Sequence, residues 1–260
     1  MTSSRVVDSR APSGQANILL MTATIAPSSD TFLLSHRDPM KRLDEYVRAL
    51  RFYARLLSDG VFDRIVFVDN SGHSLERLIE TVDKLSIRDK IEFISYKASV
   101  SSKDSRYFLE MNLLIEAFTL SCTIQLLPSA RVWKVTGRYI VNNIAKIVVT
   151  APQKVDLYLN CRNIPVETAD FYLVAFTARG FNAVLRPHLE QFQTTRNGED
   201  ILRDRLRGSY PGICIVRRLR HTPRLIGIRG FDGARYGGLL DNSKFLLRTA
   251  ANHFWPDFWI

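Results

Sequence analysis

The segment Val132–Asn143 places two cations and two amides around a break in an apolar run. It opens with apolar and β-branched residues, which favour a buried strand. Thr136-Gly137 then interrupts the run, and a glycine permits a tight backbone turn. Lys134 and Arg138 lie on either side of this turn, followed by Tyr139, Asn142 and Asn143. A strand end of this kind can hold an anionic ligand, and a core strand with a solvated turn gives the same pattern.

A second polar group follows another apolar run. Ile65-Val-Phe-Val68 predicts a buried strand, and Asp69-Asn-Ser-Gly72 comes directly after it. Ligands of parallel sheets bind at the carboxyl ends of the strands, where an aspartate can accept hydrogen bonds from a base or from ribose hydroxyls. Asn70 and Ser71 add further donors and acceptors. The same four residues also suit a turn selected for its conformation, so both interpretations remain open.

The order of the apolar segments predicts an α/β fold with strands and helices in alternation, hence a mainly parallel central sheet flanked by helices. The expected strands are Asn17–Ile25, Ile65–Val68 with its loop up to His73, Ile91–Tyr96, the run from Val132, Lys154–Asn160 and Phe171–Phe176. The first of these is apolar on both faces, which indicates a central position in the sheet.

A helix is expected to begin at Pro39, with Asp38 as its N-cap. Apolar residues from Leu43 to Leu57 recur at helical spacing and predict a face packed on the sheet. The other face is expected in solvent and carries Arg42, Glu45, Arg48, Arg51 and Arg55. Further helices are expected at Tyr107–Leu120, Phe181–Gln193 and Glu199–Arg207.

A chain of 260 residues can form one sizeable α/β domain, which we place at 16–260 after a polar, disordered tail over 1–15. The net charge of +10 and the pI of about 9.7 indicate anionic partners. Three widely spaced cysteines suit neither a disulfide framework nor a metal site, which favours a reducing cytoplasm. The sequence lacks the apolar run of a membrane span and the apolar core of a signal peptide.

The first two strands and the helix between them resemble the nucleotide-sugar half of a GT-A glycosyltransferase, in which the second strand commonly ends Ile-Val-Val-Asp-Asp-Gly-Ser. Lys134-Val-Thr-Gly-Arg-Tyr139, with Asn143-Ile144 after it, is similar to the Lys-x-Thr-Gly-Arg-Tyr motif of bacterial glycosyltransferases that build cell-surface polysaccharide. Those enzymes also carry an acid on a preceding helix, which Glu110 matches, and a late Gly-x-x-Gly element similar to Ile226–Gly233.

This resemblance spans about residues 17 to 240 and implies a single GT-A-like (Rossmann-like) catalytic domain. It implies transfer of a sugar from a nucleotide-sugar donor to a surface-polysaccharide or lipid-linked glycan acceptor. Most GT-A enzymes hold Mn²⁺ or Mg²⁺ on an Asp-x-Asp pair, which this sequence lacks, and the nearest substitute, Asp156–Arg162, offers one acid. We therefore expect no cofactor and no metal ligand, with Lys134 and Arg138 neutralising the phosphates and Arg229 and Arg235 behind them.

The candidate site residues follow from these patterns. For proton transfer we favour Glu110, Asp156 and Asp200 among the acids, which also include Glu199 and Asp232. Glu110 also suits a solvated helix position. His73 is the histidine nearest the expected nucleotide loop. The expected nucleotide-sugar contacts are Thr24, Asp69, Asn70, Ser71, Lys134, Thr136, Gly137, Arg138, Tyr139 and Asn143.

Two further segments suggest a partner. The basic run Arg217–His221 and the aromatic tail Phe254–Ile260 suit peripheral contact with the anionic inner face of the plasma membrane. The tail alternatively closes an apolar groove of the domain itself. A basic nucleic-acid-binding protein is the rival interpretation, but the cations are scattered and no nucleic-acid-binding motif occurs, so nucleic acid is not expected. The third interpretation is a protein that binds a nucleotide sugar without catalysis and serves as an assembly partner.

Overall fold

A computed structural model describes residues 14–29, 36–99, 101, 104–164, 166–187, 197–229 and 232–254. The expected disordered tail, 1–15, lies almost entirely outside these ranges. The aromatic tail also lies outside them after Phe254.

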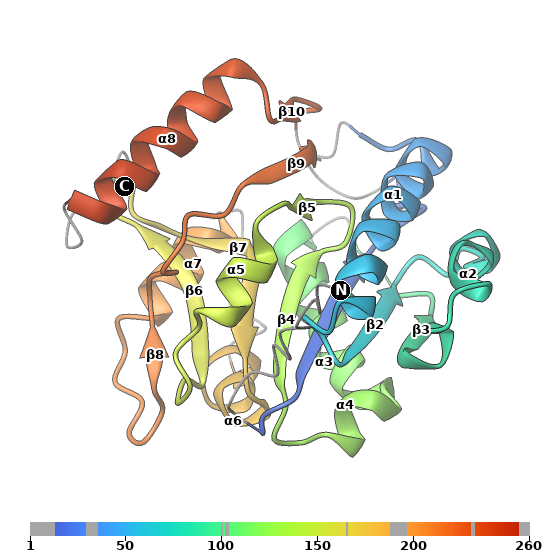
Figure 1. The fold of residues 1–260 in the computed structure, drawn as a ribbon, viewed down its shortest axis with the longest axis horizontal. Helices are drawn as coiled ribbons and strands as arrows, with labels where there is room; N and C mark the ends of the chain where they lie inside the picture. The colour runs from blue at the N-terminus through green and yellow to red at the C-terminus, as the bar shows by residue number, and fades with distance from the viewer. Residues whose placement is uncertain are drawn as a thin grey trace, which may run out of the picture.

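A seven-stranded sheet runs through the centre of the molecule in the order β3-β2-β1-β4-β7-β6-β8, with helices on both faces (Figure 1). Its strands are β1 (Asn17–Ala23), β2 (Arg64–Asp69), β3 (Ile91–Ser95), β4 (Arg131–Thr136), β6 (Leu157–Arg162), β7 (Thr168–Phe176) and β8 (Ile215–Val216). Strands β3, β2, β1 and β4 are parallel neighbours, and β6 is parallel to β8. The predicted α/β fold with a mainly parallel sheet is confirmed.

Strand β7 is antiparallel to both of its neighbours, β4 and β6. Residues 163–167 alone join β6 to β7. A parallel connection requires a crossover of a dozen or more residues, so this short link makes the pair a hairpin.

The helices are α1 (Pro39–Ser58), α2 (Glu76–Asp83), α3 (Arg106–Leu120), α4 (Cys122–Leu126), α5 (Ile144–Val149), α6 (Ala178–Gly180), α7 (Gly198–Arg205) and α8 (Leu239–Phe254), with short turns η1 (Arg88–Lys90) and η2 (Phe181–Leu185). A small second sheet joins β10 (Arg235–Tyr236), β9 (Leu225–Ile228) and β5 (Ile140–Val141). The helix expected over Phe181–Gln193 is a π-helical turn to Leu185, and 188–196 lie outside the described residues. Helix α8 was not predicted.

Helix α1 begins as predicted, because the Asp38 carboxylate accepts hydrogen bonds from the amides of Met40 and Lys41 and Pro39 occupies the first turn. Its apolar stripe packs on one face of the sheet. The prediction for the other face was wrong at two positions, since Arg42 and Glu45 are 4% and 6% exposed. Both lie in the first two turns, where the helix meets the carboxyl edge of the sheet and charged groups bond to one another.

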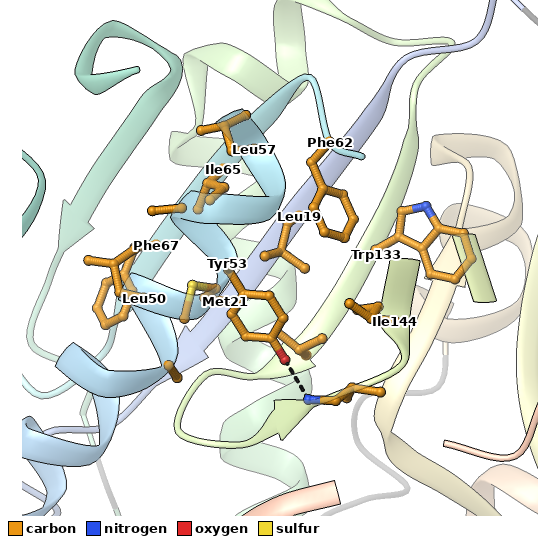
Figure 2. Packing of buried hydrophobic residues seen from close by; sticks show 14 of the residues in the cluster. Leu19, Met21, Leu50, Tyr53, Leu57, Phe62, Ile65, Phe67, Trp133 and Ile144 are labelled. Carbon is orange, nitrogen blue, oxygen red and sulfur yellow. Dashed lines mark hydrogen bonds between the residues drawn. The ribbon is translucent and has the colours of Figure 1, made fainter. Parts of the chain in front are cut away.

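The residues of β1 alternate between two cores, as expected for a central strand. Leu19 and Met21 pack with α1 and Trp133, whereas Ile18 and Leu20 pack with α3. Figure 2 shows the first of these cores, in which the Tyr53 ring lies among apolar side chains. The Tyr53 hydroxyl donates to the carbonyl of Tyr139 at 2.9 Å and accepts from the amide of Val141 at 3.0 Å. One core side chain thus fixes the segment that follows β4.

We expect Tyr53→Phe to lower the free energy of unfolding by about 1–3 kcal/mol, because it leaves a buried amide and a carbonyl without partners. Urea denaturation measures the loss. Tyr96→Phe is the matched control, since the Tyr96 hydroxyl is buried without a hydrogen-bond partner and its removal should be neutral or stabilising. Equal losses in the two variants would contradict this account.

Candidate functional site

A cavity of about 650 Å³ opens at the carboxyl ends of β1, β2 and β4. This volume is typical of a site for a small ligand. The strand ends supply Thr22, Thr24, Asn70, Ser71 and Thr136, and helices α1 and α3 supply further walls. The two polar strand ends singled out in the sequence therefore meet at one cavity, because carboxyl ends of parallel strands share one edge of a sheet.

Glu110 of α3 is held on one side by three side chains. Lys134 Nζ lies 2.5 Å from Glu110 Oε1, and the hydroxyls of Thr22 and Thr136 each donate to the same oxygen at 3.2 Å. The other carboxylate oxygen, Oε2, makes no hydrogen bond with any described residue. Since Glu110 lines the cavity and its side chain is 24% exposed, Oε2 is available to a ligand.

The register of β1 and β4 builds this cluster. It pairs Thr22 with Thr136, so their hydroxyls lie side by side beneath α3. The next residue, Gly137, donates its amide to the Thr22 carbonyl at 2.8 Å, and a Cβ there would lie 2.8 Å from that same oxygen. The predicted turn at Gly137 is confirmed, since the Tyr139 amide donates to the Thr136 carbonyl at 2.8 Å, and the close approach of two backbones also requires a glycine there.

Lys134 is fully buried behind Glu110. Its ammonium also donates to the Phe171 carbonyl and lies 4.2 Å from the centre of the Phe171 ring. Burial lowers the pKa of Lys134, and the adjacent Glu110 carboxylate opposes that effect. The Lys134 ammonium is thus paired with groups of the protein itself, Glu110 and the Phe171 carbonyl. The geometry gives no support to the expectation that Lys134 contacts a phosphate.

Five other cations line the cavity: Arg42, Lys97, Arg106, Arg138 and Arg229. Two of them form the wall itself. Arg138 donates to the Ile228 carbonyl and to the Tyr139 hydroxyl at 3.2 Å, and it lies 3.5 Å from Glu45. Arg42 donates through Nε and Nη2 to the Thr24 carbonyl.

Lys97 and Arg229 are more available to a ligand. The Lys97 side chain is exposed and has no hydrogen bond or ion pair within the described part of the chain. Arg229 pairs with Asp232 through Nη2 at 3.1 Å, and its Nη1 has no partner among the described residues. The cations outnumber the two acids of the cavity wall, Glu110 and Glu199, so the cavity favours an anion.

Asp69 does not line the cavity. Its buried carboxylate accepts hydrogen bonds from the amides of Ile25, Ser71 and His73, at 2.8, 3.0 and 3.3 Å, and from the Ser71 hydroxyl. These donors occupy the lone pairs that the sequence had assigned to a nucleoside. Asp69 therefore joins the loops after β1 and β2, while Asn70 and Ser71 face the cavity.

Lys134 and Gly137 lie behind the cavity lining, and three more expected site residues, Asp156, Asp200 and Asn143, lie farther from it. Asp156 precedes β6 and lies at the end of the sheet where β4 begins, away from the carboxyl ends of the parallel strands. The register shows this, because Leu157 pairs with Phe176 of β7, and Phe176 pairs with Val132 at the start of β4. Burial acts to raise the pKa of Asp156, but hydrogen bonds from Arg179 and the Cys214 amide hold it below its ordinary value.

Asp200 accepts from the Asn197 side chain at 3.2 Å on α7. Asn143 bonds the Thr222 carbonyl and the Arg224 amide, and so holds the chain that leads into β9. The geometry thus supports none of these three as a ligand contact.

Glu199, one residue before Asp200, is the acid of α7 that lines the cavity. Burial, followed by the neighbouring Asp170 carboxylate, raises the pKa of Glu199 to about 7. The Phe171 amide, which lies 3.4 Å from Oε1, opposes this effect together with Arg162 and Arg106. Asp170 itself is held by Arg162 at 2.7 Å and by the Asn160 amide at 2.8 Å.

Sequence reasoning missed several residues of the cavity, among them Arg42, Tyr46, Lys97, Arg106 and Tyr107. A signal existed for Arg42, because the first turn of a helix that follows a parallel strand lies at the carboxyl edge. Lys97 follows β3 in the same way. The pairing of Glu45 with His36 at 3.3 Å and with Arg138 has no signal in local sequence.

Comparison of the sequence with protein-family models and with curated proteins gives no match. Within the described ranges, no three His, Cys, Asp or Glu side chains come together as they would around a metal ion. No helix of the described part of the chain is long and apolar enough to cross a membrane. Inferences about function therefore depend on the cavity itself.

The raised pKa of Glu199 predicts a stability that depends on pH. Its folded-state pKa of about 7 exceeds the ordinary 4.5, so its contribution is complete below pH 4.5 and is lost as the pH rises to 7. This difference corresponds to about 3 kcal/mol. Urea denaturation from pH 5 to 8 should show Glu199→Gln losing this part of the pH dependence. Glu80→Gln, at an exposed position of α2, should retain it. Parallel profiles for the two variants would show that Glu199 does not titrate in this range.

Proposed function

We propose that this chain is a GT-A-like glycosyltransferase that moves a sugar from a nucleotide-sugar donor to a glycan or lipid-linked acceptor. One observation carries the proposal: a carboxylate with one fixed and one available oxygen, Glu110, shares a cavity with a cation-lined wall at the carboxyl edge of the sheet. The parallel strands β3-β2-β1-β4 and the Lys134–Tyr139 motif, which contributes Thr136, Arg138 and Tyr139 to the cavity, are compatible with that fold.

The cations suit the diphosphate of a donor. Lys97 and Arg229 have donors to spare, whereas Arg138 adds positive charge from the wall. Charge-assisted hydrogen bonds to phosphate are the strongest that side chains make. Asn70 and Ser71, at the end of β2, offer polar groups to the nucleoside, and Tyr46 and Tyr107 offer aromatic surface.

Glu110 suits the proton transfer. In an inverting reaction, the acceptor hydroxyl gives its proton to Glu110 Oε2 while its oxygen attacks the anomeric carbon. The bond to the nucleoside diphosphate breaks, and the leaving group takes the electron pair. Cations along the wall then balance the charge that develops on the phosphate. Lys134, Thr22 and Thr136 hold Oε1 and so fix the carboxylate during the reaction.

Donor binding gives the first test. UDP-, GDP-, CMP- and dTDP-sugars are screened by thermal shift, with Mn²⁺ and with EDTA, and we expect one class to stabilise the protein in EDTA. Lys97→Gln/Arg229→Gln should weaken that binding about tenfold or more, because two charged contacts to phosphate are lost. Lys84→Gln/Lys154→Gln removes the same charge at exposed positions outside the cavity and should bind normally. A requirement for Mn²⁺ would contradict phosphate binding by cations alone.

Transfer gives the second test. Glu110→Gln should reduce transfer by about a hundredfold or more and leave donor binding intact. Because this change leaves Lys134 buried without its partner, Glu110→Gln/Lys134→Met removes both charges and should fold without recovering activity. Asp200→Asn, outside the cavity, should transfer normally. Donor binding with no transfer in the unaltered protein would instead favour a silent nucleotide-sugar-binding partner.

A further inference from the structure

Helix α8 presents an apolar face to solvent. Leu246, Leu247 and Phe254 are 65%, 68% and 68% exposed, and of the side chains from Asp241 to Phe254 only Ala251 is buried. Leu246, Ala250 and Phe254 follow one another at intervals of four residues, and Leu247 lies three residues before Ala250, so all four share one face.

The face of α8 that packs on the body of the protein carries Asn252, the half-buried Phe245 and the buried Ala251. Arg218 donates to the Asn252 side chain at 2.7 and 3.1 Å, and Asn252 donates to the Thr222 hydroxyl at 2.7 Å. The Arg224 guanidinium lies 5.8 Å from the centre of the Phe245 ring. An amphipathic helix of a monomeric domain normally turns its apolar stripe inward. Here three large apolar side chains, Leu246, Leu247 and Phe254, face solvent instead, which indicates a further partner.

Several features define the chemistry of that partner. Lys244 of α8 and Arg224 beside it are exposed, and the whole chain carries a net charge of +10. Six residues, Trp-Pro-Asp-Phe-Trp-Ile, follow α8 in the sequence. Tryptophan is enriched at the interface between lipid and water. Leucine and phenylalanine on one face with cations on the other are typical of helices that lie in such an interface.

We infer that α8 binds peripherally to an anionic lipid bilayer, with Leu246, Leu247 and Phe254 inserted among the lipids and Lys244 at the headgroups. The 16-residue helix is about 24 Å long, so it would lie in the plane of the membrane.

The position of α8 relates this surface to the cavity. Tyr236, which lines the cavity, ends β10 shortly before α8 begins, and Figure 1 shows α8 along the same edge of the molecule as β9 and β10. Docking through α8 would bring the cavity close to the lipid surface. This inference does not depend on the proposed transfer reaction, although a lipid-linked acceptor would be consistent with both.

Co-sedimentation of the full chain with lipid vesicles tests the inference. We expect binding to vesicles that contain phosphatidylglycerol, weaker binding to phosphatidylcholine alone, and a decrease with added salt. Leu246→Gln/Leu247→Gln should lower the partition coefficient at least about tenfold, because two side chains no longer gain from leaving water. Both residues are exposed, so an unchanged thermal midpoint should confirm that the variant folds.

The matched control is Leu126→Gln/Val149→Gln, which removes two apolar side chains that are 79% and 73% exposed on α4 and α5. It should bind vesicles normally. Tryptophan emission adds a local readout, because Trp133 is fully buried and a blue shift on vesicle addition would come from Trp255 and Trp259.

Three outcomes would overturn the inference. One is unchanged vesicle binding by Leu246→Gln/Leu247→Gln. Another is equal loss of binding in the Leu126→Gln/Val149→Gln control. The third is absence of vesicle binding. If the chain then forms a dimer that Leu246→Gln/Leu247→Gln dissociates, a second copy of the chain is the occupant of this face.

Discussion

The buried ammonium of Lys134 is the constraint on which the site depends. Removing a charged group from water costs several kcal/mol, so it requires an opposite charge and further acceptors close by. Glu110 supplies the charge, and the Phe171 carbonyl and Thr136 hydroxyl supply the acceptors. These contacts join α3, β4 and β7 at one point. They also fix one carboxylate oxygen and leave the other toward the cavity.

The remaining charges divide into those that build the wall and those that face the ligand. Arg42 and Arg138 donate to backbone carbonyls at the ends of β1 and β9, and Glu45 lies between Arg138 and His36. Lys97 and Arg229 retain free donors. The two acids of the cavity differ as well, since Glu110 is paired with a cation and the half-buried Glu199 lies near the Asp170 carboxylate. Burial beside Asp170 therefore raises the pKa of Glu199 to about 7.

The sequence by itself determined the central architecture. Apolar runs and caps are local signals, so β1, β2, β3, α1 and α3 appear close to where the patterns predict them. Strand ends of a parallel sheet meet at one edge by geometry, which brought Thr24, Asn70, Ser71, Thr136 and Arg138 to a common cavity with Glu110. The hairpin β6–β7 was not predicted, because the expected strands Lys154–Asn160 and Phe171–Phe176 left a longer connection between them than the observed 163–167. Helix α8 was not predicted either.

The tertiary structure alone decided what each charged group does. Lys134 and Arg138 flank the same glycine, yet one is sealed behind Glu110 and the other lines the cavity. The Asp69 carboxylate accepts hydrogen bonds from backbone amides and does not line the cavity. Glu199, rather than Asp200, faces the cavity. Helix α8 shows the same limit, since its pattern reveals two faces but not which one meets the protein. Hydrogen-bond partners and burial are set by residues far away in sequence, and no local pattern records them.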